Sequence, residues 1–251
     1  MAGIIGFDVG NTLLHIDGNR VSNLLVDYGH SIPACQICDA ERHARFAVDK
    51  RLLLCLEAGH TLRSGSASMD STHLWRQYFA NLLGLLGVSS LHHIEIMTRL
   101  LEIEGREIPG LWSSPLPGTE PMLAGLKQRD YLLAAVSNSD GRLRQKLASV
   151  NLHQYFDLIV DSKEEGIEKP DAKIFHVVVE RLHCRGGGHF IYIGDLYSVD
   201  VLGARKAGYD ALLFDPGNLY RGIADDAISG WDGLTQYLQT TSCDTKSRGA
   251  R

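Results

Sequence analysis

Residues 3–14 read GIIGFDVGNTLL, and this stretch decides the fold of the 251-residue chain. An apolar run of a length suited to a buried strand ends on the carboxylate of Asp8, and small and polar residues then turn the chain. A buried parallel strand brings its last side chain to the open edge of the sheet, where α/β proteins bind their ligands. The stretch therefore predicts a strand over 3–7 with Asp8 at a functional edge.

The composition is that of an ordinary globular protein, with 44% hydrophobic and 22% charged residues. A net charge of −5 and a pI near 6.1 give no electrostatic reason to expect nucleic acid or an anionic membrane as a partner. No apolar run approaches the roughly 18 residues that cross a bilayer, and residues 1–7 are neither basic nor long enough for a secretion signal. The cysteines are scattered and odd in number, so we expect a reducing, cytoplasmic location.

Residues 20–108 carry helical patterns and no strand signal. The clearest helix is the third, in which Trp75, Tyr78 and Phe79 recur at helical spacing with Leu82 and Leu86. Proline and glycine residues between Pro109 and Gly118 then close the segment. An all-helical block inside an α/β pattern predicts an inserted domain, with helices over 20–30, 39–58, 70–87 and 91–106.

From residue 119 helical and apolar segments alternate. Strands alternating with helices predict a parallel sheet with right-handed crossovers. We therefore expect an α/β core over 1–16 and 112–238, a helical cap over 17–111, and a flexible tail over 239–251. The expected strands are 131–136, 156–160, 190–193 and 211–214, and the expected helices are 119–129, 141–149, 170–183 and 198–207.

Chemically capable side chains recur where these strands end: Asp8, Ser137, Asp195 and, in nearby loops, Lys169 and Asp200. In an open parallel sheet such ends share one edge. Carboxylate oxygens suit Mg²⁺, which takes one or two of them from protein and completes its shell with water and phosphate. A lysine places a compact positive charge on a phosphate, and a hydroxyl adds a donor. The set therefore predicts a site for a phosphoryl group and Mg²⁺.

Four motifs resemble those of the haloacid dehalogenase superfamily, in the order that the family uses. They are Asp8-Val9-Gly10-Asn11-Thr12, Ser137, Lys169-Pro170 and Gly194-Asp195 with Asp200 five residues on. The resemblance covers about residues 1–238, and a helical insertion after the first motif is typical of one subgroup. It implies a Rossmann-like core with an inserted helical cap that opens over the site and selects the substrate.

The resemblance also implies roles for these residues. Asp8 is the expected nucleophile, forming an aspartyl-phosphate with a small phosphorylated metabolite. Mg²⁺ is expected on Asp8, the backbone carbonyl of Gly10 and Asp195, with Asp200 beside it directly or through water. The phosphate is expected to be held by Ser137, Asn138 and Lys169.

Gly10 is the departure from the family pattern, because phosphatases of the family usually have a second aspartate there. That aspartate protonates the leaving oxygen and then activates water. General acid–base help is typically worth about 10²–10⁴ in rate, so its loss predicts slow hydrolysis of alkyl esters. His15, Asp17 or a cap residue is a candidate substitute.

Two alternatives stay open at this point. Relatives that cleave other bonds also lack an aspartate at the position of Gly10; carbon–halogen cleavage is disfavoured by Gly194-Asp195, and phosphonate cleavage would need Lys50, the single lysine of the cap block, as a Schiff base. The other alternative is a phosphate-binding or interaction protein that has lost turnover. The oligomeric state is open as well.

Overall fold

The computed structural model describes residues 3–60, 71–183 and 188–248. Within this part a parallel sheet of six strands has the order β5-β4-β1-β6-β7-β8. The strand expected over 3–7 is central, because Ile4 of β1 pairs with Leu132 of β4 and Phe190 of β6. The strands are β1 (Ile4–Phe7), β4 (Leu132–Ser137), β5 (Leu158–Asp161), β6 (Phe190–Gly194), β7 (Asp210–Phe214) and β8 (Ala227–Ile228).

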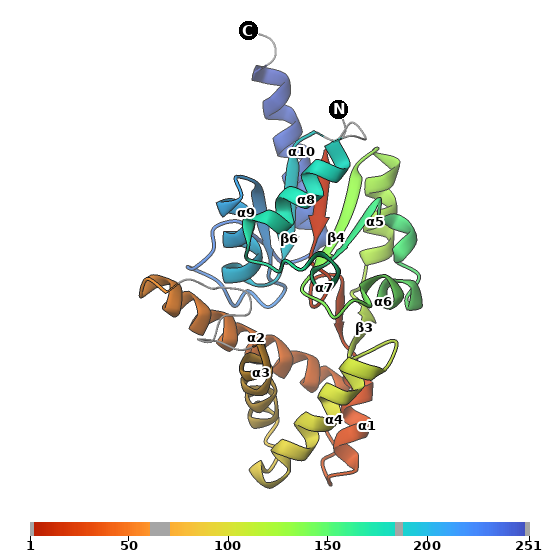
Figure 1. Cartoon of the computed structure of the whole chain (residues 1–251), viewed down its shortest axis with the longest axis vertical. Helices are drawn as coiled ribbons and strands as arrows, with labels where there is room; N and C mark the ends of the chain where they lie inside the picture. Colours follow the sequence, from red (N-terminus) through yellow and green to blue (C-terminus); the bar gives the residue numbers. More distant parts are fainter. Residues whose placement is uncertain (1–2, 61–70, 184–187, 249–251) are drawn as a thin grey trace.

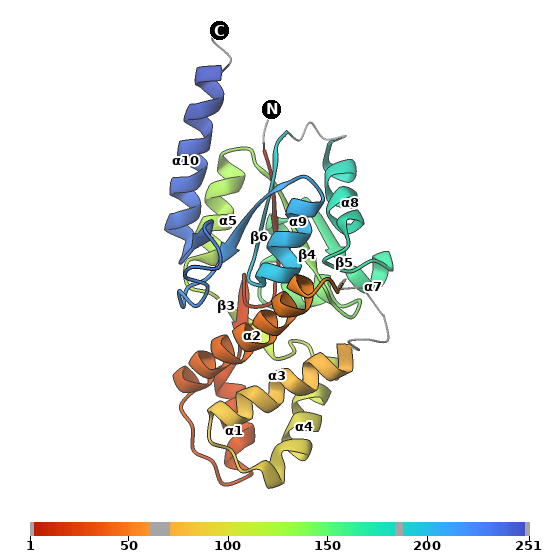
Figure 2. The same cartoon turned by 90° about the vertical axis from the view of Figure 1, so that its left-hand side faces the viewer.

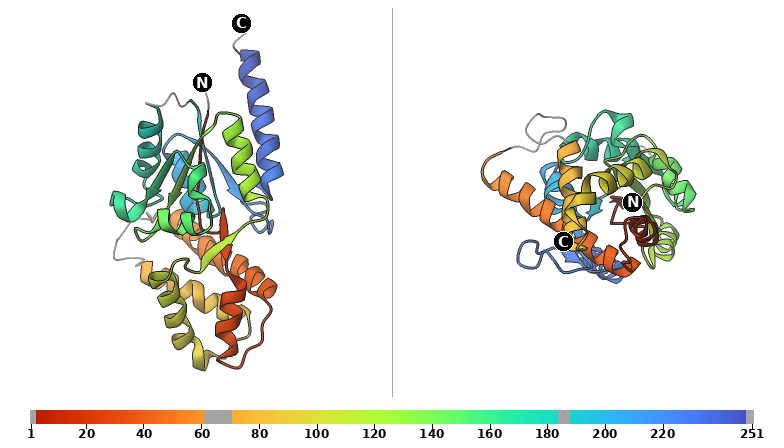
Figure 3. Two further views of the ribbon diagram at one scale, coloured as in Figure 1. Left: turned by 90° about the vertical axis from the view of Figure 1, so that its right-hand side faces the viewer. Right: turned by 90° about the horizontal axis from the view of Figure 1, so that it is seen from below.

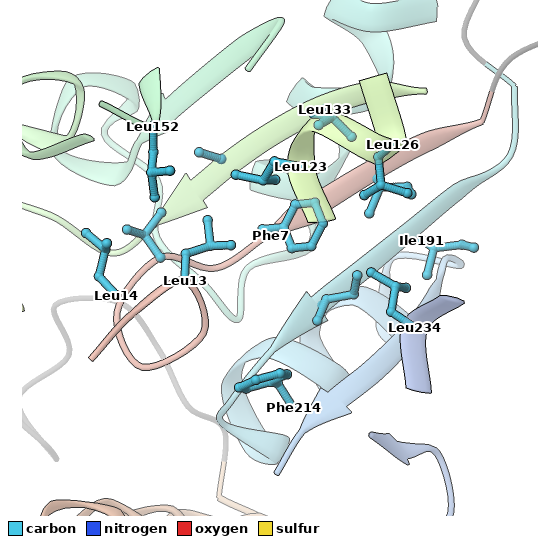
Figure 4. Packing of buried hydrophobic residues seen from close by; sticks show 14 of the residues in the cluster. Phe7, Leu13, Leu14, Leu123, Leu126, Leu133, Leu152, Ile191, Phe214 and Leu234 are labelled. Carbon is cyan, nitrogen blue, oxygen red and sulfur yellow. The ribbon is translucent and has the colours of Figure 1, made fainter. Parts of the chain in front are cut away.

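Side chains of β1 alternate between the two faces of the sheet, as the period of two in a strand requires. Ile5 and Phe7 pack into one buried cluster and Ile4 into another. Figure 4 shows Phe7 among leucines of helix α5 and apolar residues of neighbouring strands. The first face is covered by α5 (Thr119–Gln128), α6 (Leu143–Ser149) and α10 (Trp231–Arg248), and the second by α8 (Ala172–His183) and α9 (Leu202–Lys206).

Four helices form the cap, which lies at the carboxyl ends of the strands (Figure 1). They pack around their own buried cluster, which includes Val21, Ile37, Phe79 and Leu100. Helix α2 lies nearest the sheet, between the core and the other cap helices (Figure 2). The helices are α1 (Gly18–Val26), α2 (Ala34–Glu57), α3 (Ser71–Leu85) and α4 (His93–Arg106), so all four expected helices are present.

The two chain crossings between core and cap pair with each other. Strands β2 (Leu14–Ile16) and β3 (Trp112–Pro115) form an antiparallel ribbon in which His15 lies opposite Ser114. The left view of Figure 3 shows β3 leading from α4 back to the core. The sequence predicted only a turn and a proline-rich linker here. The domain limits at 16/17 and 111/112 stay a prediction. Both limits fall at or within this ribbon.

The last helix of the chain runs past the expected end of the core. Helix α10 continues to Arg248, and the flexible tail expected over 239–251 stays a prediction. Leu234 and Leu238 are buried against the sheet, and this packing anchors the first turns of α10. The polar residues that follow continue the helix from these anchored turns. Helix α2 also begins at Ala34, earlier than the expected 39, directly after Pro33. Among the described residues, no helix combines the length and apolarity that crossing a membrane requires.

Candidate active site

The residues singled out from the sequence converge at the carboxyl edge of the sheet. Asp8 follows β1, Ser137 ends β4 and Asp195 follows β6. Lys169 comes from the loop between α7 (Ser162–Glu165) and α8, and Asp200 from a single π-helical turn, η3 (Tyr197–Val201). All five line one cavity of about 900 Å³ between the sheet edge and the cap, as do Gly10 and Asn138.

Lys169 is the centre of this group. Its buried ammonium donates to Asp8 Oδ1 at 2.6 Å, to Asp200 Oδ1 at 2.7 Å and to the Tyr192 hydroxyl at 2.9 Å. Burial alone would lower the pKa of Lys169, but the charges of Asp200 and Asp8 raise it well above its ordinary value. The lysine therefore stays charged, next to the expected nucleophile.

Asn138 positions Lys169 through the backbone. Its Oδ1 accepts from the Lys169 N–H at 2.8 Å, and its Nδ2 donates to the Lys169 carbonyl at 2.9 Å. Both ends of the amide are thus used to hold the loop that carries the lysine. A direct contact of Asn138 with phosphate stays a prediction.

Asp8, Asp195 and Asp200 fit a divalent cation. One carboxylate oxygen from each lies within 4.8 Å of the others, and all three residues are buried. Burial raises the pKa of Asp8 well above its ordinary value, and the charge of Lys169 opposes this only in part. Carboxylate oxygens are the hard ligands that Mg²⁺ prefers. The charge of a bound Mg²⁺ would offset the cost of burying several carboxylates together.

The spacing of the last motif has a steric reason. Asp200 folds back so that its Oδ2 accepts from the Leu196 N–H at 2.9 Å. A Cβ added to Gly194 would lie 2.4 Å from Asp200 Cγ, so a side chain at 194 would collide with this carboxylate. Glycine at 194 therefore allows Asp195 and Asp200 to share one site.

The cap contributes polar residues that the sequence motifs did not identify. Arg45 of α2 donates from Nη1 to Asp195 Oδ2 at 2.5 Å, and Thr12 donates to the other carboxylate oxygen at 3.3 Å. Asp49, one turn further along α2, accepts from the Tyr197 N–H at 2.8 Å. A usable signal existed, because Glu41, Arg45 and Asp49 recur every fourth residue along the helix expected over 39–58.

An aromatic ring borders the open space beside Gly10. A Cβ at this position would have one neighbour within 4 Å, Trp112 Cδ1 at 3.9 Å. The Trp112 indole donates to Asn11 Oδ1 at 3.0 Å. Gly10 thus has room for a side chain, and an indole of β3 lies nearest to it.

Of the substitutes considered for an acid at Gly10, His15 and Asp17 lie elsewhere, whereas the cap residues His60 and Glu104 line the cavity. His15 Nδ1 bonds to the Ile16 carbonyl at 2.9 Å, and Asp17 caps α1 by accepting from the Arg20 N–H at 3.1 Å. Neither residue is among those that line the cavity. Lys50 is exposed on α2 and outside the cavity lining, so the described structure does not support it as a Schiff-base lysine.

Comparison with known proteins agrees with this geometry. A family model described as haloacid dehalogenase-like hydrolase matches residues 3–208. The glyceraldehyde 3-phosphate phosphatase of Methanothermobacter thermautotrophicus is 35% identical over 100 residues, covering 39% of this chain and 44% of that protein. Haloacid dehalogenase-like hydrolase domain-containing protein 3 of Bos taurus is 40% identical over 110 residues, covering 42% of this chain and 41% of that protein. The matched stretches thus span less than half the length of these curated relatives.

A solved structure extends the likeness to nearly the whole chain. The HAD-hydrolase YfnB from Bacillus subtilis matches with a TM-score of 0.60 at 21% identity, covering 95% of this chain and 99% of that one. At this identity the likeness establishes a shared fold. Since the family model spans most of the chain and the motifs meet in one cavity, the chain belongs to the haloacid dehalogenase-like hydrolase family.

Proposed function

We propose that the protein is a Mg²⁺-dependent phosphatase of small phosphorylated molecules, with Asp8 as nucleophile. The observation that carries the proposal is the buried cluster in which Lys169 contacts Asp8 and Asp200, with Asp195 alongside. The similarity to a glyceraldehyde 3-phosphate phosphatase supports the class of substrate. The odd number and scattered placement of the five cysteines favour a reducing, cytoplasmic setting.

Asp8 would attack the phosphorus atom of the ester. A bond forms between a carboxylate oxygen and phosphorus while the bond from phosphorus to the leaving oxygen breaks, and water then hydrolyses the aspartyl-phosphate. Lys169 would hold the transferring group and offset the negative charge that gathers around Asp8, and the Ser137 hydroxyl would donate to the phosphate. When bound, Mg²⁺ would be held by Asp8, the Gly10 carbonyl and Asp195, with Asp200 beside it, and would neutralise charge on the phosphate.

Proton transfer is the weak step. In the family pattern, the carboxylic acid at the position of Gly10 protonates the leaving oxygen. Glycine has no side chain that could do this. We expect turnover to be slow for alkyl esters, by about 10²–10⁴ relative to an enzyme with that acid.

Phosphate release from p-nitrophenyl phosphate tests the proposal, with the wild type and Asp8→Asn compared with and without Mg²⁺. We expect turnover only for the wild type with Mg²⁺. Thermal unfolding of both proteins serves as the control for folding. Equal release by Asp8→Asn, or release that does not depend on Mg²⁺, would contradict the proposal.

A second candidate is a phosphate-binding protein with negligible turnover, and Gly10 is the observation that favours it. Binding of beryllofluoride in the presence of Mg²⁺, without hydrolysis of any ester in a broad panel, would favour this alternative.

A further inference from the structure

Two tryptophans form an aromatic wall in the cavity that holds Asp8. Trp75 of α3 and Trp112 of β3 both line the cavity, with ring centroids 5.3 Å apart and planes inclined at 59°. Trp75 is 39% exposed, whereas Tyr78 and Phe79 behind it are buried in the cap. Tyr78 and Phe79 also line the cavity but are buried in the packing of the cap, so Trp75, beside Trp112, offers the more exposed ring surface to a ligand.

The position of Trp112 relates this wall to the chemistry. Its Cδ1 is the nearest atom to the place where a side chain at residue 10 would begin. In the usual arrangement that side chain supplies the proton for the leaving oxygen. Here the group that borders this place is an indole, which has no transferable carboxyl proton.

We propose that the substrate is an aryl phosphate, that is, the phosphate ester of an aromatic hydroxyl, with its ring packed against Trp75 and Trp112. This inference rests on the proposed phosphatase function. The bond from phosphorus to the aryl oxygen breaks as Asp8 bonds to phosphorus, and the oxygen leaves as an aryloxide with the electron pair of that bond. An aryloxide is a far weaker base than an alkoxide. It can therefore leave without being protonated, and the missing carboxylic acid at position 10 costs less in this step. Water then releases phosphate from Asp8, and solvent takes the proton.

The cavity is compatible with this class of ligand. Its volume of about 900 Å³ lies in the range of small-molecule sites. Aromatic pairs add a geometric preference to the burial of apolar surface, so the wall would select a planar ring over an aliphatic chain.

Four substrates separate the two parts of the inference, each assayed for kcat and KM with Mg²⁺. Phenyl phosphate has a ring and a weakly basic leaving oxygen, acetyl phosphate has such a leaving oxygen without a ring, a nucleoside monophosphate has a ring on an alkyl ester, and glycerol phosphate has neither. We expect KM to be lowest for phenyl phosphate, and kcat/KM for phenyl phosphate to exceed that for the two alkyl esters. A series of substituted phenyl phosphates should show kcat/KM rising steeply as the pKa of the phenol falls.

The wall is tested by Trp75→Leu, with Leu85→Ala as the matched control. Leu85 lies on the same helix, is exposed, and does not line the cavity. We expect Trp75→Leu to raise KM for phenyl phosphate roughly two- to tenfold, and by more than for acetyl phosphate. Leu85→Ala should change neither value.

The outcomes distinguish this inference from the proposed function. A KM for acetyl phosphate at or below that for phenyl phosphate, or a kcat/KM for the nucleoside monophosphate that equals or exceeds that for phenyl phosphate, would overturn the aryl phosphate assignment and leave the phosphatase function standing. An equal KM change for phenyl and acetyl phosphate in Trp75→Leu would also overturn it. Absence of Mg²⁺-dependent turnover on all four substrates would instead contradict the phosphatase function itself.

Discussion

Gly10 has room for the Cβ of a side chain. A Cβ at this position would make one ordinary contact, at 3.9 Å, and the backbone is not in the left-handed region. We expect Gly10→Asp to raise kcat/KM for glycerol phosphate by about 10² or more, because kcat/KM reports the step in which a positioned acid protonates the alkoxide as it leaves. Phenyl phosphate should gain much less.

Gly10→Asn is the control for this change, since it has nearly the same shape without a titrating group. Steady-state phosphate release by the two variants measures the effect. If Asn and Asp raise turnover equally, the missing proton donor is not what limits the wild type.

Most of the carboxylate and lysine site could be predicted at the residue scale. Asp8 and Asp195 follow neighbouring parallel strands, which must end at one edge, so their proximity needs no knowledge of packing. Tyr192 could not be predicted, because its strand reads as a plain apolar run. Its hydroxyl accepts from Lys169 because the register of β6 against β1 sets the height and the face of the sheet at which Tyr192 lies.

At the scale of elements, α2 brings a cation to the expected metal site. Arg45 donates to Asp195 Oδ2 at 2.5 Å and lies 3.4 Å from Glu41 Oε1. A metal bound at the expected site would share Asp195 with this guanidinium. We therefore expect Arg45→Met to bind Mg²⁺ about ten- to a hundredfold more tightly, since a hydrogen bond between charged groups contributes about 1.5–3 kcal/mol.

Isothermal titration of Mg²⁺ into the two proteins measures this effect directly. Arg42→Met is the matched control, because Arg42 lies on the same helix and pairs with Asp39 away from the site. Because Arg45→Met also removes the charged partner of the buried Glu41, which then keeps only the Tyr78 hydroxyl among its partners described here, the double variant with Glu41→Gln checks that a loss of folding is not the cause. Unchanged or weaker Mg²⁺ binding would show that Arg45 does not compete with the metal.

The short elements escaped prediction for a physical reason. Strands β2 and β3 have three and four residues, and among the described strands they pair only with each other, across almost a hundred residues of sequence. Neither has room to display a period of two. The longer helices of the cap were predictable because their apolar faces repeat over several turns, as Tyr78, Phe79 and Leu82 do in α3.

For the molecule as a whole, Asp49 joins the cap to the core. This cap residue is fully buried and accepts from the Tyr197 and Ser198 N–H groups and from the Ser198 and Tyr220 hydroxyls. The sequence predicted that a cap exists but not how it docks, because these bonds depend on the placement of two separately folded segments.

The Asp49 contact makes the stability of the protein depend on pH. Burial raises the pKa of Asp49 to about 6, although the hydrogen bonds from Ser198 and Tyr220 act to lower it. Between about pH 4 and pH 6 the folded protein keeps a proton that the unfolded chain has released. The unfolding free energy contributed by this group therefore falls as pH rises through that window, by about 3 kcal/mol in all, and is level above it.

Asp49→Asn isolates this contribution, because the amide keeps an acceptor for the core N–H groups and does not titrate. Asp8, Asp200 and Glu41 also have pKa values raised by burial, and they titrate alike in both proteins. Urea unfolding of both proteins from pH 4 to pH 8 should show the wild type losing about 3 kcal/mol relative to the variant as pH rises. A difference between the two that is constant across this range, or that grows in favour of the wild type, would mean that Asp49 is already ionised in the folded protein at pH 4 and that its donors outweigh the cost of burial.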